Sequence, residues 1–181
     1  MGAWINRGER TVYESPWFRL NLADVELPDG RHLDHYLLRQ RPVVLTACLD
    51  GQGRVLMLWR HRFIPDTYGY ELPSGVVEPG EDLEAAAARE TLEETGWKPG
   101  PLKHLLVVEP SAGFSDAVHH AYYAESAEHI GAPEDAIESD RIEWVPLADV
   151  PALISQGKIR AANTVATLLQ LRSGLIQDRS N

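Results

Sequence analysis

The chain has 181 residues, of which 44% are hydrophobic and 24% are charged. This length suits one domain with a buried core, and the composition excludes the collagen-like, solenoid and wholly disordered classes. Acidic residues outnumber basic residues by 27 to 17, which gives a formal net charge of -10. That charge argues against binding of duplex nucleic acid, but it allows a small phosphate substrate if metal ions neutralise the site.

Cysteine usage and hydropathy predict a cytoplasmic protein. The only cysteine, Cys48, lies in the apolar run VVLTACL, so an intrachain disulfide is impossible and a buried thiol is expected. The N-terminus MGAWINRGER lacks the apolar segment of a signal peptide. No apolar run approaches the length of a transmembrane helix, so we expect no membrane partner.

The first part of the chain predicts strands. Residues 17–39 alternate roughly in period two around a Pro-Asp-Gly turn at 28–30, which predicts a hairpin. A second hairpin is predicted over 42–60 with its turn at 50–53, and its first arm is apolar enough to be covered on both faces. Residues 68–75, YGYELPSG, predict a further strand.

The second part of the chain mixes helices with strands. Residues 83–95 predict the clearest helix, with Asp82 as its N-cap and Gly96 as its C-terminal glycine. The remaining predicted elements are strands at 102–109, 117–124 and 142–147, a short helix at 150–159 and a longer helix at 161–174. Together these elements predict an α/β (α+β) fold with a largely antiparallel or mixed sheet between helices.

The predicted helix 83–95 carries a crowded acidic face. Positions i, i+3 and i+4 share one helix face, so Glu90, Glu93 and Glu94 converge. Arg89 reaches Glu93 at i+4 spacing, and the preceding turn brings Glu81 close. Like charges raise one another's pKa unless a counter-charge is present. The face is therefore either a solvated acidic surface or a site for a hard cation such as Mg²⁺, which prefers oxygen ligands and can activate water.

The exact spacing favours the cation site. The stretch fits G-x5-E-x7-R-E-x2-E-E-x-G at Gly75, Glu81, Arg89, Glu90, Glu93, Glu94 and Gly96, a far more specific signal than a short motif. It resembles the Nudix box, the signature of a superfamily that hydrolyses nucleoside diphosphates linked to another moiety. The resemblance implies an α/β/α sandwich with a mixed β-sheet and an N-terminal β-hairpin, Mg²⁺ or Mn²⁺ as cofactor, and cleavage of a pyrophosphate bond by water.

The resemblance also implies roles for individual residues. Carried over position by position, it makes Glu90, Glu93, Glu94 and the carbonyl of Ser74 the metal ligands. Arg89 and Glu81 would orient this set, and Arg89, Glu93 and Glu94 would belong to the catalytic group. The glycines Gly75 and Gly96 would be structural.

Over most of its length the chain resembles the ADP-ribose pyrophosphatase branch, in its N-terminal hairpin and in ELPSGVVEPGE, SAGFSD and QGKIRAANTVATLLQL. The resemblance implies a homodimer with contacts from the N-terminal region 1–40, although an intrachain sheet is an equally ordinary interpretation of this hairpin. One domain, 1–181, would then contain this region, a core at 41–150 and C-terminal helices at 151–175.

The same resemblance makes a small-molecule nucleotide sugar, with ADP-ribose first, the expected substrate. Arg62 matches a position near phosphate, and Glu71 matches one near the metal or the substrate. Ala112 stands where the branch usually has proline, and Trp59 and His61 alter an arginine-rich pattern, so other nucleoside-diphosphate sugars stay candidates.

Two further residues carry predictions outside the box. Phe114, in the loop PSAGFSD, is expected either to contact substrate or to pack within that loop. The family's closing strand, aligned with IEWVPL, makes Glu138 the candidate general base, with Glu93 or Glu94 as the alternative. A polar surface loop around Glu138 is the competing interpretation.

Two alternative functions stay open from the sequence. The first is hydrolysis of nucleoside triphosphates or dinucleoside polyphosphates by the same box. The second is a non-catalytic nucleotide-sugar sensor. The intact box favours an enzyme, because a sensor of this kind usually carries a decayed box or an added DNA-binding domain.

Overall fold

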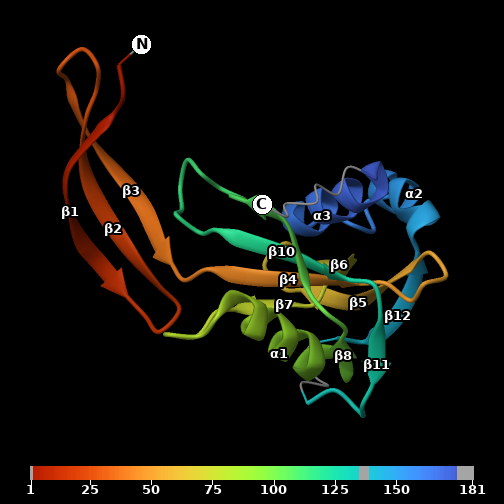
Figure 1. Ribbon diagram of the computed structural model, residues 1–181. Helices are drawn as coiled ribbons and strands as arrows, with labels where there is room; N and C mark the ends of the chain where they lie inside the picture. The colour runs from red at the N-terminus through yellow and green to blue at the C-terminus, as the bar shows by residue number, and fades with distance from the viewer. Residues whose placement is uncertain (1, 135–138, 175–181) are drawn as a thin grey trace, which may run out of the picture. The chain divides into compact units, whose positions relative to one another are not determined.

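The computed structural model describes residues 2–134 and 139–174 (Figure 1). Contacts between residues divide the chain into two compact units. Unit 1 consists of Met1–Pro42 and Glu109–Val118, and unit 2 of Val43–Val108 and His119–Asn181. The assignment of 1–181 to a single domain stays a prediction.

Unit 1 is built on a three-stranded antiparallel sheet in the order β1-β2-β3. The strands are β1 (Ile5–Glu14), β2 (Phe18–Glu26) and β3 (His32–Gln40). The predicted hairpin is confirmed as β2 and β3, with Gly30 at a φ of 83° in the turn. β1 was not predicted, because all ten of its residues are exposed and leave no alternation of apolar and polar positions.

The segment 109–118 is bonded to β3 within unit 1. The Leu38 amide donates to the carbonyl of Phe114 at 2.8 Å, and the Asp116 amide donates to the carbonyl of Leu38 at 3.1 Å. The Asp116 carboxylate also accepts the amide of Gln40 at 2.8 Å. The loop that contains Phe114 is therefore fixed to β3 by its backbone.

Unit 2 contains the remaining strands in three sheets. They are β4 (Val43–Cys48), β5 (Arg54–Arg62), β6 (Thr67–Glu71), β7 (Ser74–Val76), β8 (Trp97–Pro99), β9 (Lys103–Val108), β10 (His119–Ala124), β11 (Ala127–His129) and β12 (Arg141–Pro146). The sheet orders are β7-β4-β10-β9, β12-β5-β6 and β11-β8. β4 and β10 run parallel while the other pairs are antiparallel, so the predicted mixed α/β fold is confirmed.

Helices cover both faces of the sheet that contains β4 (Figure 1). They are α1 (Leu83–Thr95), α2 (Val150–Ser155), which follows the short 3-10 helix η1 (Leu147–Asp149), and α3 (Ala162–Ser173). Val44 packs in a cluster with Ala86 of α1, whereas Leu45 packs in a cluster with Leu168 of α3. Successive residues of a strand point to opposite faces, which explains why β4 is apolar throughout.

Two expectations about strands are wrong. β4 and β5 do not form the predicted hairpin, because β7 and β10 occupy both edges of β4. An isolated β-bridge between Leu49 and Val55 links the two arms instead. The single strand predicted at 68–75 is two strands, β6 and β7, which belong to different sheets. Pro73 lies between them, and proline cannot donate a ladder hydrogen bond.

The ends of α1 follow the prediction. The Asp82 side chain accepts the amides of Glu84 and Ala85, and Gly96 closes the helix at a φ of 72°. A Cβ on Gly96 would also lie 2.1 Å from the carbonyl oxygen of Gly131, so backbone conformation and space both require glycine. Cys48 is buried as expected. None of the helices among the described residues is long and apolar enough to cross a membrane.

Candidate active site

A single guanidinium, that of Arg89, joins the acidic side chains before and within α1. Its Nε and Nη2 donate to the two oxygens of Glu81 at 2.8 and 3.0 Å. Its Nη1 donates to Glu90 at 2.8 Å and to Glu93 at 2.9 Å. The predicted contact between Arg89 and Glu93 is therefore present, and the structure gathers these box residues around one positive charge.

Gly75 provides the space for the Glu90 carboxylate. A Cβ added to Gly75 would lie 1.9 Å from the carboxyl carbon of Glu90, closer than real Cβ atoms approach. Gly75 belongs to β7. This strand therefore contacts α1 at the position of the Glu90 carboxylate. This contact gives a physical reason for the first glycine of the motif.

Within this cluster the pKa values of Glu81 and Glu90 shift in opposite directions. Hydrogen bonds from Arg89 lower the pKa of Glu81 to about 2, so this carboxylate is firmly ionised. Burial raises the pKa of Glu90, and the charges of Glu93 and Glu81 raise it further against the opposing effect of Arg89. The cluster contains three carboxylates and one guanidinium. The two neighbouring carboxylates therefore add to the effect of burial on the pKa of Glu90.

Glu94 differs from the other two glutamates of the predicted face. Its side chain is only 4% exposed and forms a 2.8 Å ion pair with Arg60 of β5. Its second oxygen accepts the amide of Ser74 at 2.7 Å. Glu94 thus connects α1 to β5 and to the start of β7, next to the predicted ligand Ser74.

Arg60 was not among the predicted site residues. The signal was available, because Arg60 has the same strand parity as the buried residues Leu56 and Leu58. An arginine among buried positions of a strand indicates a buried carboxylate partner. Its 2% exposure and its pair with Glu94 fit that pattern.

The donor chemistry of the cluster fits a divalent cation. Glu81, Glu90 and Glu93 supply carboxylate oxygens, which are the donors that hard cations prefer, and these three carboxylates share one guanidinium, so a cation would offset their remaining negative charge. Among residues 2–134 and 139–174, no group of three or more acidic, histidine or cysteine side chains is already disposed as a metal site. Arg89 bonds to these carboxylates instead. The metal roles of Glu90, Glu93, Glu94 and Ser74 stay predictions.

Two predicted substrate residues, Arg62 and Glu71, lie together in unit 2. The Arg62 Nε donates to the two oxygens of Glu71 at 3.0 and 3.1 Å, across the paired strands β5 and β6. Both line a cavity of about 580 Å³, whose walls also include the β5–β6 turn and Arg160. Arg160 was not among the predicted site residues.

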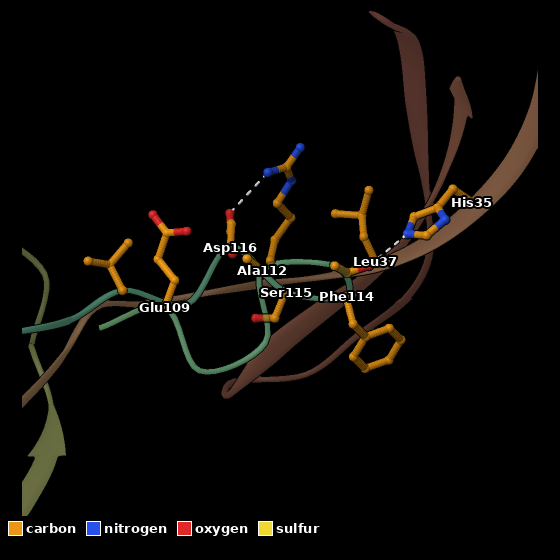
Figure 2. Close-up of a pocket in the computed structure, with 10 residues that line it drawn as sticks. His35, Leu37, Glu109, Ala112, Phe114, Ser115 and Asp116 are labelled. Carbon is orange, nitrogen blue, oxygen red and sulfur yellow. Dashed lines mark hydrogen bonds and ion pairs between the residues drawn. The ribbon is translucent and has the colours of Figure 1, made fainter. Parts of the chain in front are cut away.

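Phe114 lies in unit 1 and lines a different cavity, of about 420 Å³. Figure 2 shows the Phe114 ring and the carboxylates of Glu109 and Asp116 pointing in opposite directions from the loop. The Nε2 of His35 donates a 3.1 Å hydrogen bond to the carbonyl oxygen of Gly113, and Phe114 is 48% exposed. Exposure of the ring leaves both expected roles of Phe114, substrate contact and loop packing, as predictions.

The predicted base, Glu138, lies outside the described residues. The described chain reaches Glu134, whose amide donates to the carbonyl of Glu93 at 2.9 Å. The segment that leads toward Glu138 is therefore attached to α1 beside the Arg89 cluster.

Comparison with known proteins extends these observations. A family model described as "NUDIX domain" matches residues 39–168, and one described as "Nucleoside diphosphate sugar hydrolase N-terminal domain" matches residues 4–38. A solved structure of an ADP compounds hydrolase aligns with a TM-score of 0.84 at 20% identity, over 97% of this chain and 95% of that one. At that identity the likeness shows the fold.

Two relatives show similarity along most of their sequences. The chain is 39% identical to the CMP-5'-(N-acetyl-N-hydroxy-3-aminopropyl)phosphonate hydrolase of Streptomyces rubellomurinus, over 92% of this chain and 81% of that protein. It is 28% identical to the ADP-ribose pyrophosphatase of Bacillus subtilis, over 91% of each. With the family model covering most of the chain and the box residues gathered around Arg89, the protein belongs to the Nudix family and is a Nudix hydrolase.

Proposed function

We propose that the enzyme hydrolyses the phosphoanhydride bond of a nucleoside 5'-diphosphate linked to another moiety, and that a nucleotide sugar such as ADP-ribose is its substrate. The observation that carries the proposal is the Arg89 cluster, in which three carboxylates share one guanidinium and the pKa of Glu90 is raised. A cluster with more carboxylates than guanidinium groups, together with a cavity that contains Arg62, suits a reaction in which cations and arginine share a diphosphate.

Glu90, Glu93 and Glu94, with the Ser74 carbonyl, would hold Mg²⁺ or Mn²⁺, and the metal would lower the pKa of water and offset the charge of the leaving group. Arg89 orients the carboxylates of Glu90 and Glu93. Glu94 fixes the position of Ser74 through its amide. Each of these contacts keeps an oxygen ligand in place before the substrate arrives.

A water nucleophile requires a base within hydrogen-bond reach. We assign this role to Glu138, and the attachment of Glu134 to the carbonyl of Glu93 supports it. Glu93 is the alternative, because its side chain is 30% exposed whereas that of Glu94 is 4% exposed. Kinetics of variants altered at Glu138 alone or at Glu93 alone would distinguish these two candidate bases.

A second substrate class is favoured by a specific observation. The relative with 39% identity is named for hydrolysis of a CMP-linked phosphonate. An anhydride between a nucleoside 5'-phosphate and a phosphonate presents the same P–O–P linkage, so the same carboxylates and arginines would serve. Nucleoside triphosphates and dinucleoside polyphosphates stay as further candidates.

The test is a substrate panel with Mg²⁺ that contains ADP-ribose, other nucleotide sugars, a CMP-phosphonate anhydride, triphosphates and dinucleoside polyphosphates. We expect nucleoside monophosphate and a sugar phosphate or phosphonate as products, and loss of turnover in Glu93→Gln and Glu94→Gln. Glu84→Gln, an exposed position in the first turn of the same helix, is the matched control. Turnover confined to triphosphates contradicts the nucleotide-sugar proposal, and no turnover on any substrate contradicts the hydrolytic one.

Metal dependence has its own measurement. We expect chelation by EDTA to abolish turnover, and Mg²⁺ or Mn²⁺ to restore it. Calorimetric titration of Mg²⁺ should give binding in the wild type and at least tenfold weaker binding in Glu90→Gln, since one carboxylate charge is lost. Equal affinity in the two proteins would remove Glu90 from the ligand set.

We also propose a homodimer in the cytoplasm. Unit 1 supports the dimer, because β1 is an edge strand with all residues exposed and because aromatic side chains are exposed at Trp4, Tyr13, Trp17 and Tyr36. Mass determination by light scattering tests it. A monomer with full activity would contradict it.

A further inference from the structure

The cavity that contains Arg62 and Glu71 has a positive lining in an acidic protein. Among the described residues that line it, two arginines, Arg62 and Arg160, accompany one carboxylate, Glu71, whereas the whole chain carries a net charge of -10. The N-terminal end of α3 contributes as well, since its N-cap residue Ala161 lines the cavity and makes no side-chain cap. Exposed helix amides and arginines both favour an anion.

Arg160 is the distinctive group of this lining. Arg62 is bonded to Glu71 by both Nε and Nη2. By contrast, Arg160 makes no ion pair or hydrogen bond with any residue in the described ranges. Its guanidinium therefore has donors that no described residue occupies and that can bind an anion in the cavity.

Gly157 places this guanidinium. Gly157 has a φ of 68°, and a Cβ built on it would lie 3.0 Å from Nη2 and 3.1 Å from Nε of Arg160. The absence of a side chain at this position thus lets the guanidinium lie against the backbone between α2 and α3.

The cavity lies close to the box along the chain. Glu71 lines the cavity, and Ser74, three residues later, donates its amide to Glu94. Three residues span at most roughly 11 Å even when fully extended. The cavity lining at Glu71 is thus joined by a short stretch of chain to Ser74, which is bonded to the box residue Glu94.

We propose that Arg160 binds phosphoryl oxygens of the substrate's anhydride and is a substrate-binding residue of this site. The inference rests on the proposed function. The turn residues Phe63, Ile64 and Pro65 form the apolar part of the same lining, and Phe63 and Ile64 are 81% and 84% exposed. This combination suits an anionic group that is attached to a less polar moiety.

The direct test is calorimetric titration with inorganic pyrophosphate in EDTA, so that no metal takes part. We expect Arg160→Ala to raise the Kd about tenfold or more, and Arg160→Lys to recover part of the affinity, because loss of charge-assisted hydrogen bonds weakens binding. Lys158→Ala is the matched control, since it removes an exposed positive charge from the same connection without altering the cavity lining. Its Kd should stay within about twofold of the wild type.

Steady-state kinetics with the substrate identified in the panel give a second readout. Arg160→Ala should raise KM with a smaller change in kcat if the contact forms equally in the ground and transition states. Arg160→Gln repeats the experiment with a side chain of similar length in case the alanine variant does not fold.

Each outcome has a definite meaning. No binding of pyrophosphate by the wild type, or equal weakening in Arg160→Ala and Lys158→Ala, overturns the inference. Normal hydrolysis with unchanged Kd and KM in Arg160→Ala also overturns it while leaving the proposed function intact. If no nucleotide is hydrolysed but Arg160→Ala still weakens pyrophosphate binding selectively, the proposed function fails and the anion site stands.

Discussion

Each unit contains an arginine that binds several carboxylates, and the two clusters differ in their charge balance. In unit 1, Arg39 donates two hydrogen bonds to Glu9 and one to Asp116, at distances of 2.8 to 3.1 Å. These partners lie on β1 and in the segment 109–118, so one arginine joins three parts of the unit. The Arg39 cluster has two carboxylates for one guanidinium.

The Arg89 cluster of unit 2 has a third carboxylate, and the extra charge changes the behaviour of the group. Hydrogen bonds from Arg39 lower the pKa of Glu9. In unit 2, burial and neighbouring carboxylates raise the pKa of Glu90 despite its bond to Arg89. The Arg39 cluster therefore stabilises the fold by itself, whereas the Arg89 cluster is left with negative charge that a cation would offset.

The largest effect on stability should come from the buried pair next to the Arg89 cluster. Glu94→Ala removes the carboxylate that balances Arg60 and the acceptor of the Ser74 amide. Loss of one partner of a buried ion pair costs about 3–5 kcal/mol of unfolding free energy. Urea unfolding measures this cost, with the more exposed Glu93→Ala as control; equal costs for the two variants would show that burial of Glu94 is unimportant.

Gly75→Ala should affect activity more than stability. The new Cβ would lie 1.9 Å from the Glu90 carboxyl carbon, so the carboxylate must move. A displacement of about 1 Å can cost roughly a hundredfold in rate, so we expect kcat to fall by about that factor. Gly131→Ala is the matched control because a Cβ there meets nothing within 4 Å. Unchanged turnover in Gly75→Ala would contradict the requirement for this carboxylate position.

Arg39→Ala should have a smaller effect, confined to unit 1. Its side chain is 31% exposed, and partly exposed ion pairs contribute about 1 kcal/mol or less to the free energy of unfolding. Hydrogen exchange of the amides of Leu38 and Asp116, which are bonded across β3 and the loop, should be faster in the variant. Arg31→Ala, whose pair with Asp29 is more exposed, should change neither quantity measurably.

The sequence predicted the parts of this molecule that depend on local chemistry. The N-cap Asp82, the C-terminal Gly96 and the boundaries of α1 are as expected, because caps and propensity act within a few residues. The contact of Arg89 with Glu93 follows from helix periodicity in the same way. The position of the box and the contacts within its helix could therefore be predicted from residue spacing.

The features that the sequence did not reveal depend on distant contacts. The pairing of β4 with β7 and β10 is set by which strands compete for its two edges, and a local turn at 50–53 gives no information about this competition. Arg60 and Arg160 have chemical roles only because other elements lie near them. β1 has no buried face among the described residues, so no pattern marked it.

The smallest expected effect is a pH dependence that separates the two arginine clusters. Since the pKa of Glu9 in the folded protein is below its ordinary 4.5, the stability that it contributes is complete above that pH and is lost as pH falls through the lowered pKa. The difference in unfolding free energy between wild type and Arg39→Ala should thus be constant near neutral pH and shrink as pH falls below 4.5. The contribution of Glu90 to the pH dependence of stability has the opposite sign. Because its pKa is raised in the folded protein, its ionisation disfavours the folded state as pH rises. Urea unfolding of both proteins at successive pH values measures the difference. If the difference in unfolding free energy between the two proteins stays constant into strong acid, the hydrogen bond from Arg39 does not lower the pKa of Glu9. The contrast between the two clusters would then depend on Glu90 alone.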